Sequence, residues 1–145
     1  MPVSQRKLNR AALQSLAGVR LDDAQALLAA GRFDAAYYLA GYVVECALKA
    51  CIVRGTAQYD FPDRKLAEQS WTHSLNELVG VARLRADLDT AGRNDPLLRR
   101  HWVTVEQWAE HFRYHEGIAQ QEAHGMLRAV TDPIHGVLQW VQQYW

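Results

Sequence analysis

The sequence lacks an excess of either charge and contains only two cysteines. Sixteen lysines and arginines balance sixteen aspartates and glutamates over 145 residues, so the formal net charge is zero. Nonspecific affinity for nucleic acid grows with the number of phosphates neutralised, so this balance argues against a generic polyanion binder while allowing a local basic patch. Cys46 and Cys51 lie five residues apart in one apolar segment. Helical side chains at this spacing point in different directions, which favours free buried thiols over a disulfide.

The familiar motifs for phosphate, metal and membrane binding are also missing. No Walker pattern or dinucleotide fingerprint occurs, and His111 and His115, four residues apart, have no acidic ligand motif beside them. We therefore expect no metal site and no cofactor. The longest apolar stretch, residues 35–53, contains Glu45 and Lys49, which argues against a membrane span. Because no apolar leader follows the first residues, we expect a cytoplasmic protein.

Apolar residues recur at helical spacing, and no strand-like alternation, repeat or low-complexity stretch is present. Residues 33–53 are apolar around most of a helix, which predicts a central helix flanked by other helices or by a partner subunit, with Gly41 permitting close approach. Residues 55–70 indicate a loop with at most one helical turn. Helices are expected over residues 4–30, 33–53, 74–82, 97–108 and 119–145. Asp95 is expected to cap the fourth of these helices, and Thr131-Asp132-Pro133 predicts a break in the last one. The predicted fold is a single all-α domain over residues 1–145, an antiparallel up-and-down bundle of four to five helices.

Two opposite charges lie on the predicted central helix. Glu45 and Lys49 are four residues apart in the favourable orientation for a helical ion pair. A functional interpretation has them holding a ligand, whereas a structural one pairs them with each other or pairs Glu45 with Arg20. Buried charges are usually paired, so we interpret Glu45 and Lys49 as a structural ion pair. His73 is expected to seat the third helix.

The order of several stretches resembles a known family. They are DAQALLAAGRF at residues 23–33, DAAYYLAGYVVECALKA at 34–50, THSLNEL at 72–78 and RYH at 113–115, before a final long helix. This order is similar to that of the HEPN family, small all-α domains often encoded beside minimal nucleotidyltransferases in prokaryotes. The resemblance covers about residues 8–141, and it is more specific in the first half of the chain than in the second.

The resemblance implies a candidate catalytic pair. Many HEPN proteins resemble metal-independent ribonucleases in which an arginine precedes a histidine by four to six intervening residues. In this chemistry arginine stabilises phosphate charge and histidine transfers a proton. Arg128 and His135 alone fit this spacing, although a chain with this many arginines and histidines is expected to contain one such match by chance. The structural alternative is that Arg128 ends one helix and His135 begins the next.

A second candidate is a nucleotide- or RNA-binding surface in the later half of the chain. A local cationic surface with interleaved aromatic rings suits a nucleotide or single-stranded RNA. Its predicted residues are Arg99, Arg100, Arg113, Tyr114 and His115, with His101 beside them. In the structural alternative this segment is a fixed hinge, in which Arg113 pairs with Glu110 or Glu116 and Tyr114 packs against the fold.

These observations lead to three functional hypotheses. The first is a HEPN-like homodimer in a prokaryotic nucleotide- or RNA-linked module of the toxin–antitoxin or stress type. The second is a non-catalytic interaction domain that binds a nucleotidyltransferase partner, and the third is the metal-independent ribonuclease. Homodimerisation is expected because the resembled family forms dimers and because the central helix has more apolar faces than short neighbours cover.

Overall fold

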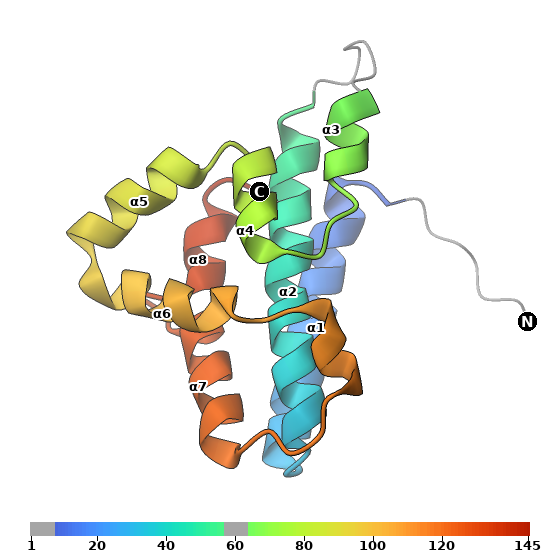
Figure 1. The fold of residues 1–145 in the computed structure, drawn as a ribbon, viewed down its shortest axis with the longest axis vertical. Helices are drawn as coiled ribbons and strands as arrows, with labels where there is room; N and C mark the ends of the chain where they lie inside the picture. Colours follow the sequence, from blue (N-terminus) through green and yellow to red (C-terminus); the bar gives the residue numbers. More distant parts are fainter. Residues whose placement is uncertain (1–7, 57–63) are drawn as a thin grey trace, which may run out of the picture.

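The computed structural model describes residues 8–56 and 64–145, and these form helices joined by short connections (Figure 1). The described part of the chain contains no β-strand, which confirms the all-α prediction. It is divided into more segments than the four or five expected. They are α1 (Arg10–Ala29), α2 (Phe33–Arg54), α3 (Arg64–Gln69), α4 (Leu75–Val81), α5 (Arg85–Asn94), α6 (Pro96–Glu106), the 3-10 helix η1 (Glu110–Tyr114), α7 (Gln120–Thr131) and α8 (Val137–Gln142).

The helices α1 and α2 form a long hairpin. Asn9 caps α1 by accepting a hydrogen bond from the Ala12 amide at 2.8 Å. After α1 ends, Gly31 adopts a φ of +75°, a left-handed conformation that glycine takes without strain, and the chain reverses into α2. The helix predicted over residues 4–30 starts at Arg10 in the structure, and residues 4–7 lie outside the described ranges.

The helix α2 is the centre of the core, as its composition predicts. Thirteen of its residues are buried, and it contacts α1, α4, α7, α8 and η1. The chain's own helices therefore flank α2, which is the first of the two arrangements expected, and homodimerisation stays a prediction. This helix is long and apolar enough to cross a membrane, but 72% of its most apolar window is buried inside the fold, as is typical of a core helix.

One contact on α2 fixes the path of the chain towards η1. Trp108 is 3% exposed and packs directly over Gly41, where a Cβ atom would overlap the indole ring. The Trp108 indole donates a hydrogen bond to the Tyr38 carbonyl at 3.1 Å. Glycine at position 41 thus lets the connection after α6 lie against the central helix, and η1 begins two residues later.

The middle of the chain is more helical than its sequence pattern indicates. Ser74 caps α4 by accepting from the Glu77 amide, in line with the helix expected over residues 74–82. The helix α5 was not predicted, because only Leu88 and Gly92 of its ten residues are buried and the apolar periodicity is correspondingly weak. The six residues of α3 also exceed the single turn expected between residues 55 and 70.

The last helices complete the bundle. In Figure 1, α1, α2, α7 and α8 run along the long axis, while α5 and α6 extend to one side and η1 lies on the other. Asp95 caps α6 by accepting from the Leu97 and Leu98 amides, each at 3.1 Å, as the sequence predicts. The break predicted at Asp132-Pro133 is confirmed, since α7 ends at Thr131 and α8 begins at Val137.

Candidate functional site

A buried carboxylate on the central helix begins a chain of charged groups that reaches the surface. Glu45 is 3% exposed, and its carboxylate accepts from His73 Nδ1 at 2.7 Å. Lys49 Nζ lies 3.6 Å from the same carboxylate, in the arrangement proposed for the structural ion pair. Arg20 takes no part, because it pairs with Asp23 at 2.8 Å. The cost of burying Glu45 is therefore offset by two partners from different segments.

His73 connects this carboxylate to a second one. Its Nε2 atom lies 3.2 Å from Glu110 Oε2, and Glu110 Oε1 in turn lies 2.9 Å from Arg113 Nη1. The imidazole thus has one nitrogen beside each of the two carboxylates. Lys49, Glu45, His73, Glu110 and Arg113 form a continuous line in which basic and acidic side chains alternate, which we name the Glu45–Arg113 network. It ties α2, the connection before α4, and η1 together.

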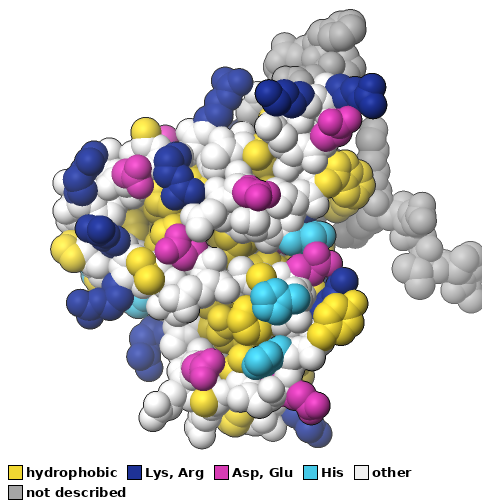
Figure 2. Space-filling view, viewed as in Figure 1, with side chains coloured by type: hydrophobic (Ala, Val, Ile, Leu, Met, Phe, Trp, Pro, Cys, Tyr) yellow, Lys and Arg dark blue, Asp and Glu magenta, His cyan; other side chains and the backbone are white. Residues whose placement is uncertain are grey.

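The outer end of the network carries an exposed aromatic ring. The Arg113 guanidinium lies 4.9 Å from the centre of the Tyr114 ring, and Tyr114 is 79% exposed. His115 beside it is also exposed. In Figure 2, histidine, acidic, basic and hydrophobic side chains adjoin one another on the side of the molecule where η1 lies. A cation fixed beside an open ring is an arrangement that binds the face of a nucleobase together with a phosphate.

The structure does not bring all the predicted binding residues together. Arg99 and Arg100 are exposed near the start of α6, beside α5, whereas Arg113 lies on η1. Figure 1 shows the start of α6 and η1 on opposite sides of α2. His101, expected beside the two α6 arginines, is 8% exposed and contacts Asp132 at 3.1 Å. The predicted cationic cluster is therefore two separate surfaces.

The candidate catalytic residues lie on either side of the break between α7 and α8. Arg128 is exposed on the last turn of α7, and its side chain has no ion pair within the described ranges. His135 lies in the connection to α8, where its Nδ1 atom is 2.6 Å from Asp95 Oδ2. The hydrogen bond that His135 donates to Asp95 raises the pKa of His135, and the same bond lowers the pKa of Asp95. This contact leaves His135 Nε2 available for another partner.

A second histidine–aspartate pair supports the same connection. Asp132 accepts from the backbone amides of His135 at 2.9 Å and Ile134 at 3.0 Å, in addition to its contact with His101. These hydrogen bonds lower the pKa of Asp132 to about 2. The connection holding His135 is thus fixed from both sides, by Asp95 at the start of α6 and by Asp132 at the end of α7.

Comparison with known families settles which family this arrangement belongs to. The sequence model of the HEPN domain matches residues 12–142, nearly the whole chain. The chain belongs to the HEPN domain family. No curated protein and no solved structure matches it significantly. The HEPN match spans both ends of the Glu45–Arg113 network as well as Arg128 and His135.

The structure also defines the surroundings of other histidines and of the cysteines in this HEPN domain. Within residues 8–56 and 64–145, no three histidine, cysteine or acidic side chains gather into a group that could hold a metal ion. His111 stacks on Phe112 at 4.9 Å, and His115 meets the edge of the same ring at 5.5 Å. Cys46 and Cys51 are buried, and burial raises the pKa of each thiol to about 11, which disfavours a nucleophilic thiolate.

Sequence reasoning missed the link between Glu45, His73 and Glu110. These residues are separated by 28 and 37 positions, and no local pattern joins them. The nearest signal was the presence of Glu45 on a helix otherwise apolar around most of its surface, because such a group needs a partner from elsewhere in the fold.

Proposed function

We propose that this HEPN protein is a component of a prokaryotic nucleotide- or RNA-linked module of the toxin–antitoxin or stress type, and that it binds RNA or a nucleotide on the surface of η1. The observation that supports this proposal is the exposed Tyr114 ring beside Arg113, whose guanidinium is held by Glu110. The Glu110 contact holds the guanidinium in place before a ligand arrives, which reduces the entropy lost on binding.

The expected affinity is local and modest. The chain has no net charge, so binding rests on one or two phosphates near Arg113 and on stacking against Tyr114. Stacking of a base on an aromatic side chain contributes about 1–3 kcal/mol, which corresponds to roughly 5- to 150-fold in affinity. Binding should weaken with added salt, with a shallow dependence that matches the small number of phosphate contacts.

Fluorescence anisotropy with a labelled single-stranded RNA tests this proposal. Tyr114→Ala should weaken binding by about 5- to 150-fold, the loss of one stacked base. Ile134→Ala is the matched control, because Ile134 is 75% exposed but lies between α7 and α8. Absence of saturable binding at moderate salt, or equal losses in both variants, would overturn the proposal.

Homodimerisation is part of the proposal, and the outer helices offer apolar side chains for it. Several apolar side chains remain exposed on the outer helices, among them Val19 on α1 at 49% and Val103 on α6 at 44%. Burying such side chains would favour association of two copies. Light scattering at micromolar concentration should therefore give twice the mass of 16.5 kDa, and a monomer would contradict this part of the proposal.

The ribonuclease hypothesis is a second candidate, favoured by the contact between Asp95 and His135. An aspartate at Nδ1 fixes the tautomer of an imidazole and leaves Nε2 for proton transfer, as in the acid–histidine pairs of hydrolytic enzymes. Arg128→Gln is the sharper test, because this exposed side chain makes no ion pair that the variant would break. RNA cleavage that persists unchanged in Arg128→Gln and in His135→Ala would end this hypothesis.

The third candidate is a non-catalytic domain that binds a nucleotidyltransferase. The exposed ring of Trp71, which is 77% exposed in the connection between α3 and α4, favours a protein partner. Copurification with the product of the adjacent gene, without RNA cleavage, would support this candidate. Loss of the complex in Trp71→Ala would locate its interface, and a complex unaffected by this change would exclude Trp71 as an anchor.

A further inference from the structure

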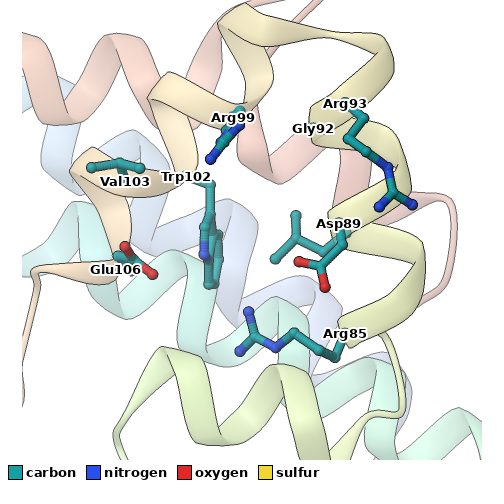
Figure 3. A pocket seen from close by; sticks show the side chains of 9 residues that line it. Arg85, Asp89, Gly92, Arg93, Arg99, Trp102, Val103 and Glu106 are labelled. Carbon is teal, nitrogen blue, oxygen red and sulfur yellow. The ribbon is translucent and has the colours of Figure 1, made fainter.

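A pocket lies between α5 and α6, away from the η1 surface. Its volume is about 470 Å³, within the range of small-molecule sites (Figure 3). Residues three or four apart on each helix face the pocket, so that Arg85, Asp89 and Arg93 on α5 lie opposite Arg99 and Trp102 on α6. Two helices that meet in this way leave a space with charged walls and an aromatic side.

The indole of Trp102 has an unmet hydrogen-bonding requirement in this wall. Trp102 is 6% exposed, and its Nε1 atom is buried without a hydrogen-bond partner in the described structure. Trp108 shows the ordinary arrangement, with its indole N–H donating to the Tyr38 carbonyl at 3.1 Å. Buried donors are nearly always paired, so this side of the pocket departs from the usual arrangement. The Nε1 atom itself has almost no accessible surface, and the indole therefore contributes its ring to the pocket wall rather than its N–H group.

The basic groups around the pocket are available for a ligand. The Arg99 side chain makes no ion pair or hydrogen bond within residues 8–56 and 64–145, and the Arg93 guanidinium contacts only the hydroxyl of Thr90 there, at 3.3 Å. Arg85 donates to the carbonyl and the side chain of Asn76, which are neutral groups. The three guanidinium groups therefore keep their charges free of carboxylate partners among the described residues.

The charge count selects the kind of ligand. Arg85, Arg93 and Arg99 contribute three positive charges, and Asp89 and Glu106 contribute two negative ones, which leaves an excess of one positive charge. A monoanion balances this excess. The guanidinium fork matches a carboxylate in a bidentate geometry, and the two acidic side chains can accept hydrogen bonds from a hydroxyl on the ligand. The indole of Trp102, with Leu88 opposite, favours a planar apolar ring.

We propose that the pocket between α5 and α6 binds a small aromatic carboxylate whose ring carries a hydroxyl group. The carboxylate accepts from Arg99, the ring lies between α5 and α6 against the indole of Trp102, and the hydroxyl donates to an acidic side chain of the wall. This site does not depend on the proposed RNA-binding function, because it shares no residue with the η1 surface.

Nuclear magnetic resonance of the ¹⁵N-labelled full chain, titrated with 4-hydroxybenzoate, tests the proposal. The Trp102 indole N–H signal, identified with Trp102→Phe, should shift and saturate because the aromatic ring of the ligand lies against the indole, while the Trp108 signal stays in place. For a ligand of this size we expect a Kd on the order of 1 mM or tighter. The methyl ester of the same acid has the ring and the hydroxyl without the charge, and it should bind at least about tenfold more weakly.

A matched pair of arginine variants separates specific binding from general charge effects. Arg99→Gln should raise the Kd for 4-hydroxybenzoate by about tenfold or more, because it removes a charged donor. Arg100→Gln removes the neighbouring exposed arginine, which does not line the pocket, and should leave the Kd unchanged. No saturable shift of the Trp102 signal, equal effects of the two variants, or equal binding of the ester would overturn the proposal. Loss of RNA binding in Tyr114→Ala with intact acid binding would show that the two sites are separate.

Discussion

Replacing Gly41 with alanine tests the contact that joins the central helix to the connection before η1. The new Cβ would overlap the ring of Trp108, which is 3% exposed and bonded through its indole to the Tyr38 carbonyl. A Cβ in this position cannot be accommodated by a small movement, because the ring atoms nearest to it belong to the rigid indole. Trp108 must therefore leave its place or α2 must shift.

The size of the effect follows from what Trp108 loses. Complete removal of a buried tryptophan side chain costs about 3–5 kcal/mol, which includes the packing of the ring. The lost indole hydrogen bond is worth about 1 kcal/mol on its own account and forms part of this loss. Alanine returns up to about 1 kcal/mol, because it is a better helix former than glycine. We expect Gly41→Ala to lower the free energy of unfolding by about 2–4 kcal/mol.

Urea unfolding followed by circular dichroism measures this change, and Gly18→Ala is the control. Gly18 is an exposed residue of α1, and a Cβ there would meet no atom within 4 Å. Gly18→Ala should raise the free energy of unfolding by about 0.5–1 kcal/mol. The same substitution should thus have opposite signs on the two neighbouring helices, with Tm lowered by about 5–15 °C in Gly41→Ala.

A double-mutant cycle identifies Trp108 as the cause. When Trp108→Ala is already present, the Cβ at position 41 has no ring to displace, so Gly41→Ala should add almost nothing to the loss. The reasoning is refuted if Gly41→Ala is as stable as the original chain. It is also refuted if its effect is undiminished in the Trp108→Ala background.

Three further predictions concern the charged groups and the thiols. Glu45→Gln should lower the free energy of unfolding by about 1–3 kcal/mol in urea unfolding, since it removes the charge of a buried carboxylate that contacts both Lys49 and His73. An unchanged value would contradict the network. The Asp95–His135 pair should stabilise the fold to an extent that depends on pH. This contribution is measured as the difference in free energy of unfolding between the original chain and His135→Gln. Because Asp95 has a lowered pKa, its contribution is present above pH 3.8 and is lost as pH falls through that lowered pKa. Because His135 has a raised pKa, its contribution to stability is present below pH 6.5 and is lost as pH rises through the raised pKa. A difference in the free energy of unfolding that stays the same at every pH would contradict the contact. Cys46 and Cys51 should resist alkylation at pH 8 until the chain unfolds, because burial raises the pKa of each thiol to about 11. Mass spectrometry measures the modification, and rapid alkylation of the folded protein would contradict this prediction.

The sequence predicted the elements whose signals are local. The position of α2 followed from its apolar circumference, the start of α6 from the Asp95 cap before Pro96, and the break after α7 from Asp132-Pro133. The helix α5 escaped prediction because it is mostly polar and packs through few residues. Its stability comes from its contact with α6 rather than from a pattern of its own.

The candidate sites, like the helices, were predicted from the sequence only where their signals are local. The sequence identified Arg113 and Tyr114 as an exposed cationic and aromatic pair, and it offered Glu110 as one partner of Arg113. It also placed Arg99 in the same cluster, but α6 separates the arginines at its start from the residues on η1. Proximity along the chain is a poor guide here, because a helix carries its ends apart by about 1.5 Å for each residue.

By itself, the sequence determined the helical class, the family and the central helix, since these depend on spacing and composition within short windows. Only the tertiary structure decided which distant groups meet: His73 between Glu45 and Glu110, Asp95 beside His135, and, around the indole of Trp102, three guanidinium groups without a carboxylate partner among the described residues. The physical reason is that a charged or polar side chain gains its pKa and its binding capacity from the groups around it. Those neighbours are set by how the helices pack, and no spacing within a single helix encodes them.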